Sequence, residues 1–467
     1  MDVDIDCHIH RESPQISTCP TFHYMSYPPE RPIPFAVVDH RRLRGRVFGI
    51  LPQDLLRHVW VLGKTGMGKS VLLEHLLRGL IERGEGCGLI DPHGELADRV
   101  LDLVPRHRLN DVVLLDAADI ERPIGWNPLD CRSVRERPLV ASGVLGTFRK
   151  VFSDFWGPRL EHVFRNTLLA LLETEQPTLF GVLRMLVEEK YRERVIARLH
   201  DPLVKFYWTR EFPEYGPAFA AEVVAPVQNK VAAVLTNPFV RAVVGQPRST
   251  VTAREIIDHR RIFVAKIAKG EVGEDASAML GAVLTSSFQL AAYGRAKVPP
   301  EARYPFTLVI DEFASFVTES FAELLAEARK YGLGLVLAHQ YLAQLDDDLR
   351  AALLGNAGTV IAFRLGASDA DVIGEEFAPE VVAGDLVRLD AHQIALRLAV
   401  RGVSTRAFTA TTLQPVSVVA GYEPIARRIS AERYGRGAPI GTYSSRSSLL
   451  SVGSSEAGMS SACGASA

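Results

Sequence analysis

One stretch, residues 58–84 with the sequence HVWVLGKTGMGKSVLLEHLLRGLIERG, limits what this chain can fold into. An apolar run, Val59 to Leu62, leads into a glycine-rich segment and then into an amphipathic run typical of a helix. The segment from Gly63 to Ser70 fits the pattern G-x-x-x-x-G-K-[ST], and both flanks are of the type that this pattern requires. The sequence therefore predicts a phosphate-binding loop between a strand and a helix.

The glycines of this loop let its backbone take positive φ and bring N–H groups close to an anion. We expect the loop to hold the phosphates of ATP, with Lys69 reaching the outer phosphates and Ser70 binding Mg²⁺. A glycine turn with a merely solvated lysine is the alternative interpretation. The predicted nucleotide-binding residues are Gly63, Lys64, Thr65, Gly66, Met67, Gly68, Lys69 and Ser70.

A second stretch, residues 305–316 with the sequence PFTLVIDEFASF, is an apolar run that ends in two adjacent carboxylates. Asp311 is predicted to hold Mg²⁺, directly or through water, and Glu312 to polarise the water that attacks the γ-phosphate. A glutamate at this place is typical of hydrolases rather than of small-molecule kinases, which exclude water. ATP hydrolysis is therefore the predicted reaction; a buried strand that ends in Asp-Glu by chance is the alternative.

Two further polar residues end apolar runs. Gln340 follows the run in residues 333–339 and is predicted to contact the γ-phosphate or the attacking water, with a surface hydrogen bond as the alternative. Asp91 ends the run in residues 86–91, and two roles stay open for it: a place near Mg²⁺ or water, or a cap on the following turn.

The order of these runs predicts the fold class. Strands that alternate with helices indicate an α/β fold with a mainly parallel sheet, whose ligands bind at the carboxyl ends of the strands. Between Arg132 and Gly245 helical periods dominate, which indicates an inserted all-helical domain. The predicted domains are a disordered lead-in over residues 1–34, the core over residues 35–131 and 246–412, the helical insertion over residues 132–245, and a C-terminal segment over residues 413–467 with a disordered Gly/Ser-rich tail from about residue 433.

Composition excludes some classes of protein. No apolar run approaches the roughly 18 residues of a membrane span, and the acidic start has no secretory signal, so we expect a cytoplasmic protein without an intrinsic transmembrane segment. The formal net charge of −2 gives no electrostatic indication of nucleic-acid binding. Five scattered cysteines argue against a disulfide framework. A zinc site near the amino terminus is a weaker idea, because the spacing of its candidate ligands fits no common module; they are Cys7, His8, His10, Cys19 and His23.

Taken together, the motifs resemble a known family, the type IV coupling proteins of conjugation (TraG/TraD-like) within the HerA/FtsK superfamily of ring-shaped DNA-pumping ATPases. The resemblance spans roughly residues 46–412. It rests on GKTGMGKS, DPHGEL, GWNPLD, VIDEF and EARKYGLGLVLAHQ followed by GTVIAFRLGASDA, in this order. It implies a RecA-like P-loop NTPase that uses ATP and Mg²⁺, forms a homo-hexamer with ATP sites between subunits, and moves DNA through a central channel.

The resemblance also implies residue roles and partners. Glu312 and Gln340 act in hydrolysis, and Arg329 is the finger that completes a neighbouring subunit's site, with Arg364 as the substitute. DNA and a relaxase or other transfer-machinery proteins are the expected partners, and the inner face of the cell membrane is an expected peripheral location. Three alternatives stay open: a HerA-like DNA-processing translocase, an ATPase of the same fold that moves protein, and a nucleotide-gated binding module without turnover, which Glu312 and Gln340 argue against.

Overall fold

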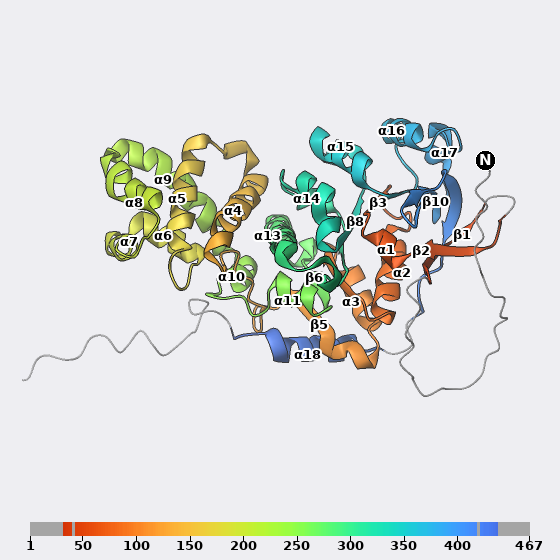
Figure 1. Ribbon diagram of the computed structural model, residues 1–467, viewed down its shortest axis with the longest axis horizontal. Helices are drawn as coiled ribbons and strands as arrows, with labels where there is room; N and C mark the ends of the chain where they lie inside the picture. Colours follow the sequence, from red (N-terminus) through yellow and green to blue (C-terminus); the bar gives the residue numbers. More distant parts are fainter. Residues whose placement is uncertain (1–30, 40–42, 418–420, 438–467) are drawn as a thin grey trace, which may run out of the picture.

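The computed structural model describes residues 31–39, 43–417 and 421–437, and it is organised around one sheet (Figure 1). The sheet has eleven strands in the order β2-β1-β13-β10-β9-β3-β8-β7-β4-β6-β5. Strands from β9 to β5 in this order pair in parallel, and the remaining neighbours pair antiparallel. The predicted α/β fold with a mainly parallel sheet is therefore confirmed.

The parallel part of the sheet is covered on both faces. Its strands are β3 (Val59–Leu62), β4 (Gly86–Asp91), β5 (Val112–Asp116), β6 (Ile262–Lys266), β7 (Phe306–Ile310), β8 (Leu333–His339) and β9 (Thr359–Ala362). Successive residues of β3 enter different cores, Val61 on one face and Trp60 on the other. Burial on both faces explains why these strands read as continuous apolar runs.

Two groups of helices provide this cover. Helices α2 (Lys69–Glu82) and α3 (Glu95–Asp102) share one core with the sheet. Helices α13 (Glu274–Gly294), α14 (Phe321–Glu327) and α15 (Asp347–Asn356) share the other. The other helices outside the insertion and the C-terminal segment are α1 (Pro52–Leu55), α12 (Lys269–Val272), α16 (Ala367–Phe377) and α17 (Ala383–Arg388).

The antiparallel part of the sheet closes the fold beside β9. Its strands are β10 (Gln393–Arg397), β13 (Phe408–Thr412), β1 (Ile33–Val38) and β2 (Val47–Ile50). The predicted terminal pair corresponds to β10 and β13, with a short hairpin of β11 (Ala399–Val400) and β12 (Val403–Ser404) between them. Strand β1 begins at Ile33, slightly before the predicted start of the core, because its side chain packs beneath α2 at Gly79.

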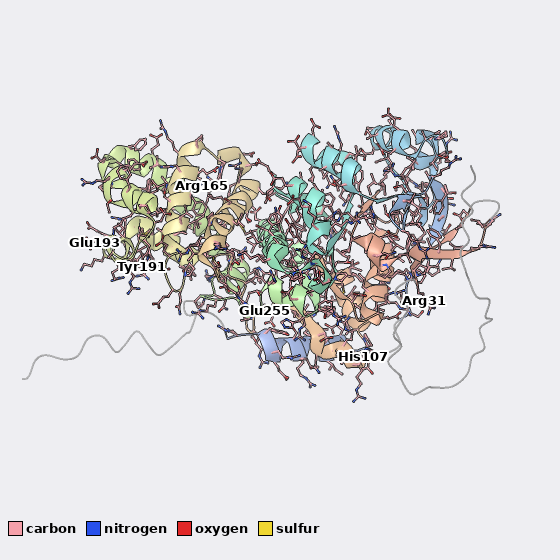
Figure 2. All side chains as sticks on the ribbon, in the orientation of Figure 1. Arg31, His107, Arg165, Tyr191, Glu193 and Glu255 are labelled. Carbon is pink, nitrogen blue, oxygen red and sulfur yellow. The ribbon has the colours of Figure 1, made fainter. Side chains whose placement is uncertain are left out.

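Residues 132–245 contain helices and no strand, as the sequence predicts. The helices between β5 and β6 are α4 (Arg137–Val151), α5 (Pro158–Leu171), α6 (Leu179–Val187), α7 (Glu189–Ile196), α8 (Pro202–Phe206), α9 (Pro217–Thr236), α10 (Pro238–Val244) and α11 (Ala253–Asp258). Figure 2 places Tyr191 and Glu193 of α7 at the end of the molecule opposite to Arg31. The domain boundaries at residues 132 and 245 stay predictions.

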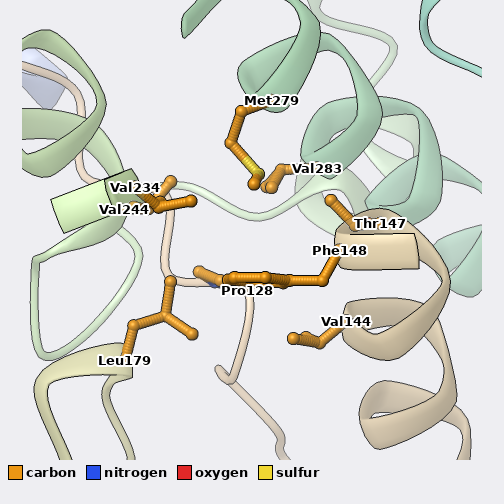
Figure 3. A pocket seen from close by; sticks show the side chains of 9 residues that line it. All are labelled: Pro128, Val144, Thr147, Phe148, Leu179, Val234, Val244, Met279 and Val283. Carbon is orange, nitrogen blue, oxygen red and sulfur yellow. The ribbon is translucent and has the colours of Figure 1, made fainter. Parts of the chain in front are cut away.

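Direct packing joins the insertion to the core. Phe148 of α4 lines a void of about 10 Å³ together with Met279 and Val283 of α13, and its ring extends toward Pro128 (Figure 3). Nearly all side chains that line this void are apolar, so it should stay dry. The insertion therefore rests on α13 through an apolar seam.

A C-terminal helix was not predicted. Helix α18 (Glu423–Tyr434) packs along β5, where the Ser430 hydroxyl accepts a hydrogen bond from the Leu114 N–H and Arg427 pairs with Asp98 and Asp116. It covers the outer edge of the sheet and ends just past the predicted start of the tail. Its sequence has a weak apolar stripe, which is why the pattern gave little signal.

Several expectations fall on other parts of the chain. The proposed zinc ligands, the first 30 residues of the lead-in and residues 438–467 of the tail lie outside the described residues. In the described part, no helix has both the length and the apolar character that a bilayer span requires.

Candidate nucleotide-binding site

The loop between β3 and α2 has the backbone geometry of an anion cradle. Gly63, Gly66 and Gly68 have φ values of 150°, 78° and 110°, which favour glycine. A Cβ on Gly63 would lie 2.5 Å from Cβ of Phe363, and one on Gly68 would lie 2.7 Å from Nδ1 of His392. The N-terminus of α2 follows at once, so unpaired backbone N–H groups and the positive end of the helix dipole face the same space.

Lys69 folds back over this loop. Its Nζ donates to the carbonyl oxygens of Gly63 at 2.7 Å and Lys64 at 3.2 Å. Burial lowers the pKa of Lys69, whereas the nearby carboxylates of Asp311 and Glu312 oppose this shift. The predicted lysine and the two predicted carboxylates, far apart in the sequence, therefore lie close together in the fold.

Asp311 and Glu312 follow directly from β7, at the edge where the parallel strands end. The Asp311 N–H donates to the Ile90 carbonyl of β4 at 3.1 Å, which fixes the chain against its neighbour. Glu312 has a φ of 51°, a left-handed conformation that costs energy for a residue with a side chain. This turn points the Glu312 side chain towards the residues that follow β8 and β4.

Two side chains hold Glu312. The Gln340 amide donates to Glu312 Oε1, and His93 Nε2 lies 3.7 Å from the same oxygen. These contacts, His93 first, lower the pKa of Glu312 to about 2, and in return Glu312 raises the pKa of His93. The glutamate is thus ionised throughout the physiological range. The structure brings Gln340 to Glu312; His93 was missed as a site residue, although it lies within the DPHGEL motif.

Asp91 caps the turn after β4. Its two carboxylate oxygens accept hydrogen bonds from the N–H groups of His93 and Ala97, both at 2.8 Å. Of the two roles left open by the sequence, the cap is the one for which contacts are present. Asp91 is fully buried and also acts on Asp311 through space.

The environment of Asp311 suits a cation. Burial, followed by the charges of Asp91 and Glu312, raises the pKa of Asp311 to about 6. A carboxylate in such surroundings is stabilised by a bound positive charge. Among the described residues no three His, Cys, Asp or Glu side chains form a metal cage. Mg²⁺ does not need one, because it usually takes one or two protein oxygens together with phosphate and water. Exposed Ser70, in the first turn of α2, is the other predicted ligand.

We therefore expect Asp311→Asn to stabilise the free chain. Without nucleotide and with Mg²⁺ chelated, the free energy of unfolding should rise by roughly 1–3 kcal/mol at about pH 7.5. The pKa of the Asp311 carboxyl is about 6 in the folded chain and 3.8 in an unperturbed carboxyl. Ionisation therefore destabilises the folded state increasingly from pH 3.8 to about pH 6, fully above pH 6 and not at all below pH 3.8. Urea unfolding at about pH 7.5 and about pH 4 measures the gain. An equal gain at both pH values contradicts this prediction.

Arg329 and Arg364 lie in different places relative to the loop. Arg329 precedes β8, whose other end carries Gln340, so within one subunit it lies about 20 Å from the site at about 3.3 Å per residue. Arg364 lies beside its own loop: its carbonyl accepts from the Lys64 N–H, and its Nε donates to the Leu389 carbonyl. Within one subunit, Arg364 therefore lies beside the loop and Arg329 lies away from it.

His392, which was not predicted as a site residue, also contacts the loop. Its N–H donates to the Met67 carbonyl at 2.8 Å, its ring lies against Gly68, and its own φ is 67°. It comes from the connection before β10, far along the chain, and no local motif marks it. The loop is therefore supported from the antiparallel side of the sheet.

Known proteins share the fold of this chain, and a family model matches most of its sequence. A family model described as the type IV secretion-system coupling protein DNA-binding domain matches residues 48–376. Among solved structures, the plasmid coupling protein TrwB with the GTP analogue GDPNP is 17% identical, with a TM-score of 0.58, over 82% of this chain and 91% of that chain. TrwB with the ATP analogue ADPNP matches over 85% of this chain and 97% of that chain, at 17% identity and a TM-score of 0.58. VirB4 of Thermoanaerobacter pseudethanolicus matches over 85% of this chain and 98% of that chain, at 15% identity and a TM-score of 0.56. No curated protein sequence matches. At these identities the structural matches show a shared fold.

Proposed function

We propose a motor function on one premise: this chain belongs to the type IV secretion-system coupling protein family, whose model covers most of its length. In this proposal the chain hydrolyses ATP with Mg²⁺ and uses the energy to move DNA through a hexameric ring during conjugative or type IV secretion transfer. Relaxase or other transfer-machinery proteins would deliver the DNA, and docking on them would hold the ring at the inner face of the membrane.

A single observation carries the proposal. Lys69 at the start of α2 and the carboxylates of Asp311 and Glu312 after β7 meet at the carboxyl edge of the sheet, with Gln340 on Glu312. Parallel strands bring distant residues together at this edge, which is where open α/β sheets bind ligands. A cationic cradle next to two carboxylates with unlike pKa values supports hydrolysis of a nucleoside triphosphate.

The loop and α2 would bind the phosphates. Their backbone N–H groups and the helix dipole attract the anion, and Lys69 would leave the carbonyls of Gly63 and Lys64 for the outer phosphates. Ser70 and Asp311 would hold Mg²⁺, which neutralises charge that develops on the phosphate oxygens. TrwB, which has the same fold, forms complexes with nucleotide analogues and with ADP and Mg²⁺, and these support the assignment.

Glu312 would act on the attacking water. Its low pKa keeps the carboxylate ionised, so it accepts a hydrogen bond from water and orients the oxygen for in-line attack. Gln340 would report the arrival of the γ-phosphate, because the phosphate and Glu312 would compete for the N–H groups of its amide. His93, in the connection after β4, contacts the same carboxylate oxygen, whereas Gln340 reaches it from the connection after β8.

Arg329 would complete the site of a neighbouring subunit in the ring. It lies at the opposite edge of the sheet from its own loop, a position that fits head-to-tail assembly, in which one subunit's edge meets the next subunit's site. An arginine supplied in trans contributes about 10³ to 10⁵ to the rate in related phosphoryl-transfer reactions. An isolated subunit should therefore be nearly inactive.

We expect DNA to stimulate the ATPase. Addition of single- or double-stranded DNA should raise turnover at least several-fold and shift the molar mass from subunit to hexamer, because closure around DNA brings fingers and sites together. One titration that follows both phosphate release and light scattering measures this. The near-neutral net charge leaves a protein cargo as the second candidate. If neither form of DNA changes turnover and a transferred protein raises it, the DNA assignment is wrong.

A further inference from the structure

The turn that carries Arg329 is held by side chains from other segments of the chain. It consists of a short 3₁₀ helix, Ala328–Tyr331, which ends at Gly332 with a φ of 72° and leads into β8. Arg329 itself is exposed, and within the described residues its guanidinium makes no hydrogen bond or ion pair. The backbone around it is fixed, while the side chain stays available.

Two other arginines bind the backbone just after Arg329. Arg295, at the end of α13, donates through Nη1 to the Tyr331 carbonyl at 2.7 Å and through Nη2 to the Tyr304 carbonyl at 2.8 Å. Arg303 donates through Nη1 to the Lys330 carbonyl and through Nε to the Val298 carbonyl at 2.7 Å. Consecutive carbonyls that follow the finger are thus each held by a guanidinium.

Packing around these contacts is tight. The Arg295 side chain is 1% exposed, and its Nε lies 3.3 Å from Asp258, so its charge is paired below the turn. A Cβ on Gly332 would lie 3.2 Å from Arg295 Nη1, so the glycine makes room for the guanidinium as well as allowing the positive φ. Removal of Arg295 would open space beneath the turn, while partly exposed Asp258 would keep its other partner, Arg254.

The segment before the turn is held as well. His58 accepts from the Leu335 N–H at its Nδ1, at 3.1 Å, so its Nε2 carries the proton and donates to the Leu325 carbonyl at 3.0 Å. Leu325 belongs to α14, which leads into the turn. The segment that enters the turn is therefore fixed to the residue before β3. The segment that leaves the turn is fixed to the end of α13 and to the connection before β7.

We propose that Arg295 and Arg303 are positioning residues, which hold the turn so that Arg329 enters the nucleotide site of a second copy of this chain in the correct place. This inference rests on the proposed function, in which Arg329 acts in trans. A finger must place its guanidinium at hydrogen-bond distance from the transferring phosphoryl group, and a displacement of about 1 Å can cost about 10²-fold in rate. If Arg295 and Arg303 only satisfied carbonyl groups of the turn, their loss would lower stability and leave kcat unchanged.

The test is a double-mutant cycle on the assembled, DNA-bound chain. Arg303→Met keeps an unbranched apolar side chain and removes the guanidinium, whose three nitrogens all donate hydrogen bonds and which lies over the Tyr331 ring. The half-buried position allows the variant to fold. We expect a fall of about 10- to 100-fold in kcat, with the Kd for a fluorescent ATP analogue unchanged. Arg303→Met combined with Arg329→Ala should be no slower than Arg329→Ala alone. Arg303→Lys, which keeps one donor, should recover part of the rate.

Control variants distinguish the role of Arg329 as a finger from the role of Arg295 and Arg303 in positioning it. Arg428→Met removes an exposed arginine of α18 and should leave turnover unchanged. Arg295→Met is the second variant at the turn and should show the same loss in kcat, checked by thermal unfolding because its site is buried. If Arg329→Ala retains full turnover, the proposed finger is wrong. If Arg329→Ala is inactive while Arg303→Met and Arg295→Met keep the wild-type kcat, or if the losses simply multiply in the double variant, the positioning role is overturned.

Discussion

Glu312→Gln should bind ATP and Mg²⁺ as tightly as the wild-type chain and hydrolyse ATP about 10² to 10⁴ times more slowly. The substitution keeps the size of the side chain but removes the negative charge that the low pKa maintains, so the group attracts and orients the attacking water more weakly. The hydrogen bond from Gln340 can still be accepted by the new carbonyl oxygen. Phosphate release and binding of a fluorescent ATP analogue, measured on the same preparation, give the two quantities.

Matched variants make this result specific. Glu319→Gln removes an exposed carboxylate close by in the sequence, paired with Arg149, and should leave both quantities unchanged. Lys69→Ala should lose binding as well as turnover, since its ammonium lies in the cradle itself. If Glu312→Gln hydrolyses ATP at the wild-type rate, the water-activating role belongs to another group.

Arg329→Ala should be nearly inactive alone and partly active when mixed with Lys69→Ala. Each variant alone lacks one half of every site, whereas a mixed ring contains junctions with an intact loop on one side and an intact arginine on the other. Equal mixing should restore at most roughly a quarter of the wild-type rate, because half of the subunits hold an intact loop and half of their neighbours hold Arg329. Turnover as a function of the mixing ratio, in the presence of DNA, measures this.

Arg364→Ala provides the contrast. Arg364 lies beside its own loop, so its loss affects the same subunit that holds the intact Lys69, and mixing with Lys69→Ala should restore nothing. If mixing with Lys69→Ala rescues Arg364→Ala but not Arg329→Ala, then Arg364 is the arginine that acts on the neighbouring subunit and Arg329 is not.

Local sequence patterns predicted the parts of the fold that depend on local physics. The apolar run before Gly63 and the helical period after Ser70 describe β3 and α2 because strand burial and helix amphipathicity both act over a few residues. The alternation of such elements implied a parallel sheet, and with it the meeting of strand ends at one edge. The placement of Asp311 and Gln340 near the loop follows from that rule alone.

Contacts between distant segments were not predictable in this way. His392 reaches Gly68 only because β10 pairs with β9, and no residue near His392 signals that pairing. Helix α18 has few buried residues and depends on Arg427 and Ser430 meeting β5. His93 was visible within a quoted motif, but its contact with Glu312 requires the order of β4 and β7 in the sheet.

The most direct test is a crystal structure of the chain with a non-hydrolysable ATP analogue and Mn²⁺ in place of Mg²⁺, with the metal located by anomalous scattering. The expected result is a metal peak at Ser70 Oγ and the Asp311 carboxylate, with Lys69 Nζ moved from the carbonyls of Gly63 and Lys64 to the terminal phosphate. A nucleotide bound elsewhere, or a Lys69 that still binds those carbonyls beside a bound triphosphate, would contradict the proposed site and the hydrolysis derived from it.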